Sequence, residues 1–170
     1  MLIQQQPKAM RQPIITNRNL IFQAFLPVLP PSVNGSYKIV KVPKKRPAGA
    51  PRRAVPEMVQ RLGASEALEQ FKAEAAWRLK SREHYRNAHL LNILRSMKEA
   101  EVKIPLEVVI HFYYETRWLH DVDGGIKAVT DAIFKELLLN DNTVIHDDVW
   151  KFADHENPRC EIAVYLLTEE

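Results

Sequence analysis

The stretch from Pro105 to Leu138 constrains the fold most, because the spacing of its apolar residues changes from a strand period to a helix period. In "IPLEVVIHFYYET" the apolar residues alternate, which predicts a strand with one buried face. The alternating residues are Leu106, Val108, Ile110 and Phe112. In "GGIKAVTDAIFKELL" they recur at helical spacing, which predicts a helix over about 125–138. Its apolar face comprises Ile126, Val129, Ile133 and Leu137.

The elements around this pair predict a single α+β domain with a small mixed sheet, in the order β-α-β-α-β-β. A strand over 20–26 ends in proline, and a helix begins after Ser65, a suitable N-cap, with Leu68, Phe71, Ala75 and Leu79 on its apolar face. Further helix is expected in "NAHLLNILRSMKEA". The stretches "TVIHDDVWKFA" and "CEIAVYLL" read as two strands of a hairpin, joined by "DHENPR". We expect residues 1–18 to form a flexible extension and residues 19–170 the domain.

Charge is distributed very unevenly along the chain. The net charge is +3, yet the first 56 residues contain ten Lys and Arg and no Asp or Glu, so the remainder carries −7. Nine of the eleven prolines also lie before residue 57, and a basic, proline-rich loop is predicted at about 38–56. Its cations are Lys44, Lys45, Arg46, Arg52 and Arg53. A basic segment on an acidic body favours a nucleic acid as partner, although a solvated tail is the plain alternative.

Several classes of protein are disfavoured by the composition. Cys160 is the only cysteine, which excludes an intrachain disulfide and a Cys-rich zinc site. No apolar run approaches the roughly 18 residues of a membrane span, and the N-terminus lacks the apolar region of a signal peptide. A cytoplasmic protein without membrane contact is therefore expected.

Carboxylates gather around the predicted helix in "DVDGGIKAVTDAIFKELLLNDN". Asp121 and Asp123 point to the same side if the chain is extended there, and Asp141 joins them only if the chain folds back after the helix. Three such oxygen ligands suit Mg²⁺ or Mn²⁺, which can activate water against a phosphodiester, and Lys127 could neutralise charge on the phosphate. The plain alternative makes Asp123 a helix N-cap and Lys127 a bridge between Asp123 and Asp131.

Other polar residues have plainer explanations. A competing ligand set consists of His146, Asp147 and Asp148, of which His146 and Asp148 share a strand face, but charge along a solvated sheet edge explains these residues better. His120 is a solvent-facing residue or an outer group of the metal site. Cys160 reads as a buried strand residue, because no activating partner for a reactive thiol is evident.

Two motifs resemble the RusA family of Holliday junction resolvases. "LPPSVNGSY", residues 29–37, is similar to the family's Pro-Pro-Ser-x-Asn signature, and "DVDGGIKAVTDAIFKELLLNDNTVI" is similar to its Asp-x-Asp-Asn-x-x-Lys helix with a following acidic turn. The resemblance implies a homodimeric, Mg²⁺- or Mn²⁺-dependent endonuclease that nicks four-way DNA junctions in pairs. The family's catalytic and metal-binding acids fall on Asp121, Asp123 and Asp141, and its essential lysine on Lys127. Asp131 matches a further helix acid, and Asn34 matches the signature asparagine, whose implied role is to shape the site or to contact DNA.

The sequence also departs from this family pattern. Gly124 replaces the asparagine after Asp-x-Asp, Gly125 follows it, and Asn140 replaces the first acid of the turn. A module that binds branched DNA without cutting it is therefore an alternative to the nuclease. A structural domain whose basic segment meets RNA or protein is a third.

Overall fold

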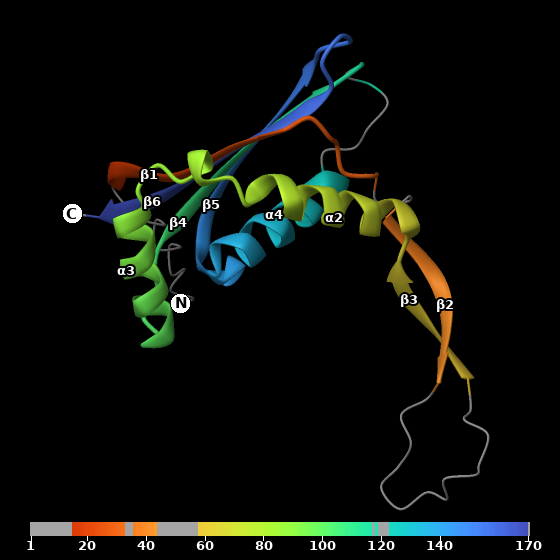
Figure 1. Cartoon of the computed structure of the whole chain (residues 1–170), viewed down its shortest axis with the longest axis horizontal. Coiled ribbons are helices and arrows are strands. Elements are labelled where there is room, and N and C mark those ends of the chain that lie inside the picture. The colour runs from red at the N-terminus through yellow and green to blue at the C-terminus, as the bar shows by residue number, and fades with distance from the viewer. Residues whose placement is uncertain (1–14, 33–35, 44–57, 117, 119–122, 170) are drawn as a thin grey trace, which may run out of the picture.

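The computed structural model of the chain describes residues 15–32, 36–43, 58–116, 118 and 123–169 (Figure 1). The strands are β1 (Ile15–Leu26), β2 (Tyr37–Pro43), β3 (Met58–Ala64), β4 (Leu106–Tyr114), β5 (Val144–Ala153) and β6 (Arg159–Glu169). The helices are α2 (Glu66–Leu79), α3 (Ala88–Glu99) and α4 (Asp123–Leu137), with short 3₁₀ turns η1 (Arg82–His84) and η2 (Asp141–Thr143).

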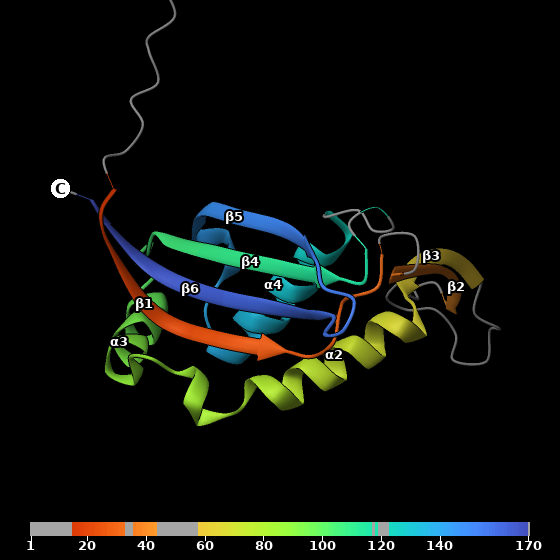
Figure 2. The same cartoon turned by 90° about the horizontal axis from the view of Figure 1, so that it is seen from above.

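The predicted α+β class is confirmed, with a mixed four-stranded sheet, a separate two-stranded hairpin and, in the described residues, three α-helices. The large sheet has the order β1-β6-β4-β5 (Figure 2). Strand β6 is antiparallel to both β1 and β4, whereas β4 and β5 run parallel. Strand β1 begins at Ile15, inside the predicted N-terminal extension and five residues before the predicted strand.

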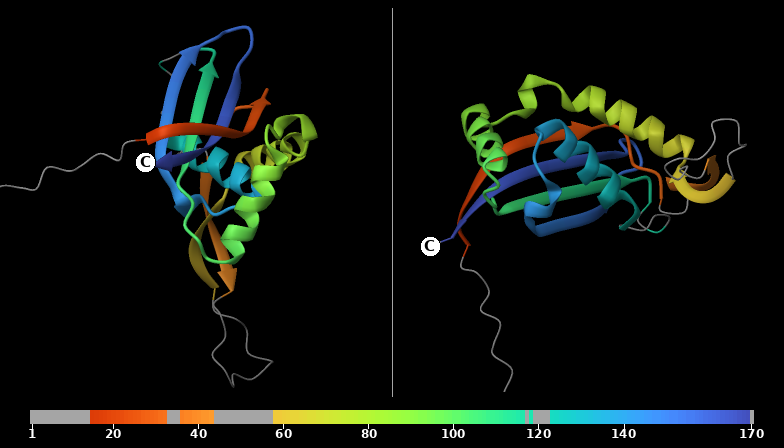
Figure 3. Two further views of the ribbon diagram at one scale, coloured as in Figure 1. Left: turned by 90° about the vertical axis from the view of Figure 1, so that its left-hand side faces the viewer. Right: turned by 90° about the horizontal axis from the view of Figure 1, so that it is seen from below.

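Strand β4 lies in the middle of the core. The alternating residues identified from its sequence are all buried, and helices α2, α3 and α4 cover that face of the sheet together (Figure 3). Its other face is only half-buried at Val109, His111 and Tyr113. The alternation of apolar residues in β4 therefore correctly predicts which face of the strand is buried, and this is the face that the helices cover.

The predicted hairpin of β5 and β6 is wrong, because β4 lies between them. A helical crossover such as α4 joins parallel strands, so β5 is laid beside β4 on the outer side. The chain then passes the end of β4, where the Asp154 N–H donates to the Tyr114 carbonyl at 2.7 Å, and returns as β6 on the other side. The linker "DHENPR" is therefore a crossing connection.

Helix α2 begins as predicted. The Ser65 side chain accepts a hydrogen bond from the Leu68 N–H at 3.2 Å, and the four residues predicted for its apolar face are the buried ones. The helical stretch predicted next is a separate helix, α3, which begins at the N-cap Asn87 after the η1 turn. None of the helices in the described ranges has the length and apolar character needed to cross a membrane.

Strands β2 and β3 form an antiparallel arm, residues 37–43 and 58–64, that extends away from the body (Figure 1). The prediction of a loop over 38–56 is therefore wrong for residues 38–43. The valines and isoleucine of "YKIVKVP" favour a strand, and its cross-strand partner lies in "MVQRLGA", beyond the proline-rich segment. Residues 44–57 lie outside the described ranges.

Candidate active site

The first turn of α4 holds the described part of the predicted site. Asp123 is the first residue of the helix and is exposed, so its carboxylate is favoured by the helix dipole. The helix begins two residues earlier than the sequence predicted, which places Asp123 inside the helix. Asp121 and His120 precede it and lie outside the described residues.

Gly125 is buried because α4 approaches the sheet closely at this point. A Cβ atom at Gly125 would lie 2.8 Å from Pro30 Cγ and 2.9 Å from Phe112 Cζ. Both distances are shorter than packed carbon atoms adopt, so only glycine fits without movement of the proline or the ring. Gly125 thus has a packing role, and its lack of a side chain lets Pro30 of the Pro-Pro-Ser motif lie against the helix.

Lys127 lies one turn after Asp123 and is largely exposed. Its Nζ is 3.2 Å from Asp131 Oδ1, with the lysine side chain 69% exposed. The hydrogen bond to Asp131 and that carboxylate's charge raise the pKa of Lys127, and the charges of Asp141 and Tyr37 act in the same direction. The ammonium group is therefore fully protonated at neutral pH and faces solvent.

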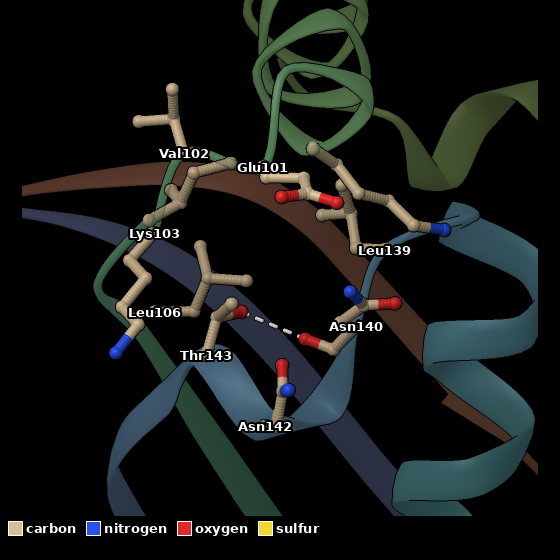
Figure 4. A pocket seen from close by; sticks show the side chains of 10 residues that line it. Glu101, Val102, Lys103, Leu106, Leu139, Asn140, Asn142 and Thr143 are labelled. Carbon is tan, nitrogen blue, oxygen red and sulfur yellow. Dashed lines mark hydrogen bonds between the residues drawn. The ribbon is translucent and has the colours of Figure 1, made fainter.

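Asp141 begins the η2 turn after the other end of α4. Asn140, Asn142 and Thr143 from this turn line a cavity of about 200 Å³ together with the α3–β4 connection (Figure 4). The Thr143 hydroxyl donates to the Asn140 carbonyl at 2.7 Å and closes the turn. Asp141 itself is exposed.

The structure does not bring Asp123 and Asp141 together within one chain. Gly125, near Asp123, lies beside Phe112 on β4, whereas η2, which contains Asp141, leads into β5 at Val144, the cross-strand partner of Leu106 on β4. These two positions on β4 are about 20 Å apart at roughly 3.3 Å per strand residue. The following strand, β5, does lie beside β4, but the parallel crossover returns the chain to the opposite end of the sheet.

The described residues contain no group of three His, Cys, Asp or Glu side chains that could hold a metal ion. Because Asp121 lies outside the described ranges, the predicted ligand set stays a prediction. The pair of Asp121 and Asp123 still fits Mg²⁺ chemically, since this ion commonly takes one or two carboxylates and keeps several waters.

Most of the predicted DNA-binding residues also lie outside the described ranges. These are Asn34, Lys44, Lys45, Arg46, Arg52 and Arg53. The arm that leads to the basic segment carries Lys38, Lys41 and Arg61, all exposed. Ser36 fixes the start of the arm, because its hydroxyl donates to the Ser32 carbonyl at 2.7 Å and its carbonyl accepts from the Ser65 N–H at 2.9 Å.

In the competing ligand set on β5, His146 and Asp148 each contact another side chain of the protein. His146 Nδ1 lies 2.9 Å from Glu107 Oε1, and Asp148 Oδ1 accepts a hydrogen bond from Trp150 Nε1 at 2.6 Å. Strand β5 is an edge strand, in agreement with the solvated edge inferred from its charges.

Sequence reasoning missed the ion pairs of Glu107. This carboxylate is 3% exposed and lies on the sheet face away from the helices, where Arg18 Nε approaches its Oε2 at 2.6 Å. A lone Glu within the apolar strand "PLEVVIHF" was the available signal, since a buried acid requires partners. Glu107 on β4 thus contacts Arg18 on β1 and His146 on β5, and so links three strands.

Cys160 is fully buried, as predicted, and burial strongly raises the pKa of its thiol. It is therefore not a reactive nucleophile. No protein-family model matches this chain, and no curated protein is significantly similar to it.

Proposed function

We propose that the chain is a metal-dependent endonuclease that cuts four-way DNA junctions, with a RusA-like fold and as a homodimer. One observation carries the proposal: the two segments on which the resemblance rests are neighbours in space. Pro30 of the first segment lies against Gly125 of the second. Tyr37, which ends the first segment, also lies close enough to influence the pKa of Lys127.

In this proposal Asp121 and Asp123 hold Mg²⁺ or Mn²⁺ at the N-terminus of α4. The bound ion would supply an activated water and stabilise the leaving oxygen of the phosphodiester. Lys127, exposed and protonated one turn later, neutralises charge on the phosphate. Asp131 orients the lysine through their 3.2 Å contact. Asp141 keeps its predicted role only if the assembled enzyme brings it to this end of the helix.

The test is a nicking assay on a labelled four-way junction and a linear duplex of the same sequence, with Mg²⁺, Mn²⁺ or EDTA. We expect paired, metal-dependent nicks in the junction alone. The variant Asp123→Asn should lose more than the roughly 10–100-fold that removal of an outer-shell metal group costs. It should bind the junction as well or better, because a negative charge near phosphate is removed.

Asp147→Asn is the matched control, since Asp147 is an exposed carboxylate on β5. It should cut like the wild type. Undiminished cutting by Asp123→Asn, or cutting in EDTA, would contradict the proposal. Loss of folding in Asp123→Asn would instead support a purely structural role at the helix start.

A second candidate is a module that holds branched DNA without cutting it. The separation of Asp123 from Asp141 by the length of α4 favours this function, because a site that needs both carboxylates would be incomplete within one chain. A junction that shifts on a native gel but stays intact with both metals would establish it. Gly124→Asn would then be the first change made to recover cutting.

A further inference from the structure

The arm exposes apolar side chains on one face. Tyr37, Ile39, Met58 and Leu62 are 40%, 71%, 52% and 72% exposed, respectively. Ile39 and Leu62 are direct cross-strand partners, and Met58 lies opposite Pro43 on the same face. We call these four residues the apolar strip.

Folding of the arm does not account for the strip. The opposite face carries the half-buried Val40, Val42 and Val59, and Val40 packs over Gly63. An isolated two-stranded hairpin is marginal in water and gains nothing from apolar side chains that stay exposed. The cross-strand pair of Ile39 and Leu62 is therefore available to a partner.

The charges of the arm indicate what this partner is. Its strands contain Lys38, Lys41 and Arg61 and no Asp or Glu. The arm of a second copy would bring equal positive charge, which opposes packing of one strip on another. Duplex DNA complements both the positive charge of the arm and its apolar strip, because its phosphates are negatively charged and its stacked bases, reached through the grooves, are apolar.

We propose that the arm enters the minor groove of DNA and that Ile39 and Leu62 insert between adjacent base pairs. Isoleucine, leucine, methionine and proline are the types of side chain that architectural proteins use as such wedges. Lys41 lies beside the pair on the same face, and Lys38 and Arg61 lie on the other face, where they can reach the phosphates of the groove walls. The inference rests on the proposed function only in taking DNA as the partner.

A wedge of this kind favours branched DNA. Insertion requires two stacked base pairs to separate, which costs free energy. This cost is least where stacking is already interrupted. The crossover of a four-way junction has such steps. The arm begins at Tyr37, shortly after Pro30, which packs against Gly125 in the first turn of α4, so insertion there would hold the junction next to that turn.

The test is binding in EDTA to a duplex and to a four-way junction that carry 2-aminopurine, a base whose fluorescence rises when it unstacks. The wild type should raise the fluorescence several-fold, more so in the junction. The double variant Ile39→Ser/Leu62→Ser should abolish this rise while retaining binding. The triple variant Lys38→Gln/Lys41→Gln/Arg61→Gln should weaken binding and reduce the slope of log affinity against log salt by about 3.

Ile93→Ser is the control, because Ile93 is 44% exposed on α3 at the opposite end of the molecule (Figure 2). It should leave both signals unchanged. Circular dichroism should show all variants folded, since the altered side chains are exposed.

A full fluorescence rise in the double variant would overturn the proposal. So would a wild-type dimer that the double variant converts to a monomer with unchanged DNA binding, since a second copy would then cover the strip. A wild type that binds and unstacks DNA but never nicks it with Mg²⁺ would overturn the nuclease and support the wedge. Absence of any DNA binding would overturn both.

Discussion

At the scale of single residues, Gly125 shows how close packing can require glycine at one position. Pro30 and Phe112 occupy the space that a Cβ would need, and the helix start is closer to the sheet than a larger side chain allows. Its neighbour Gly124 is only half-buried. The packing that requires glycine at position 125 therefore does not explain the glycine at position 124.

We expect Gly125→Ala to destabilise the protein. The added methyl group overpacks the site at a cost of about 1–3 kcal/mol, more than the gain in helix propensity of up to about 1 kcal/mol. Urea unfolding gives the free energy directly. Gly124→Ala is the matched change and should be neutral or stabilising. Equal effects of the two substitutions would show that the contact with Pro30 and Phe112 does not govern stability.

The buried thiol of Cys160 makes stability depend on pH in the alkaline range. Burial raises its pKa in the folded state, whereas an unfolded chain ionises its thiol at about pH 8.5. The contribution is complete below that pH and is lost as pH rises toward the folded-state value, with a slope of about 1.4 kcal/mol per pH unit. Urea unfolding between pH 7 and 10 should show this decline.

Cys160→Ala is the control for this pH dependence. It should be less stable at pH 7, because a buried atom is removed, yet its stability should decline less steeply above pH 8.5. Parallel curves for the two proteins would assign the alkaline loss to other groups. Tyr114, whose pKa burial raises to about 12, would be the next residue to test.

At the scale of elements, the arm contains a close contact between its two strands. A Cβ at Gly63 would lie 2.8 Å from Val40 Cγ2, and the branched valine has little freedom to move away. The twist that brings the two strands together in this region therefore requires glycine.

Gly63→Ala should open the arm while the body stays intact. Hydrogen exchange in residues 37–43 and 58–64 should accelerate by at least about tenfold, since such a hairpin is marginal. The thermal midpoint of the body should not change. Adding Val40→Ala to Gly63→Ala removes the clash and should restore part of the protection. Slow exchange in the single variant would show that the arm accommodates the methyl group.

The C-terminus of α4 is secured by side chains from another element. Arg95 Nε donates to the Leu137 carbonyl at 2.8 Å and Lys98 Nζ to the Leu138 carbonyl at 2.9 Å, so α3 supplies cations where the helix dipole is negative. These contacts fix the turn that leads into η2. They hold Asp141 at the end of the helix opposite to Asp123.

At the scale of the whole molecule, charge is segregated between the basic first third and the acidic remainder. The arm, whose strands contain Lys38, Lys41 and Arg61, extends away from the sheet and its helices (Figure 1). Residues 44–57, outside the described ranges, contain five Lys and Arg and one Glu. Seven of the ten cations in the first 56 residues thus lie in β2 or in the segment that joins it to β3.

Replacing residues 44–57 by Asn-Gly should separate DNA affinity from stability. Pro43 and Met58 are cross-strand partners, so a two-residue turn can join them. The slope of log affinity against log salt should fall by about 4, because about five phosphate contacts are lost. Thermal unfolding of the body should be unaffected. An unchanged slope would exclude the segment from the DNA interface.

The fold class, the strand β4, the helix α4 and the N-cap Ser65 were predictable because each depends on local spacing and side-chain chemistry. The position of β6 was not, since a hairpin and a crossing connection have similar linkers. The strand character of residues 38–43 was also hidden, because its pairing partner lies beyond a proline-rich segment in the sequence.

The sequence by itself determined the apolar faces of β4 and α2, where carboxylates and cations gather along the chain, and which chemistry they suit. Periodicity, capping and charge are properties of neighbouring residues, and they survive any arrangement of the elements. Only the tertiary structure decided that α4 separates Asp123 from Asp141, that Pro30 meets Gly125 and that Glu107 joins three strands. Those relations depend on the order of the strands and on the direction of the crossover. Both are determined by contacts between residues that are far apart in the sequence.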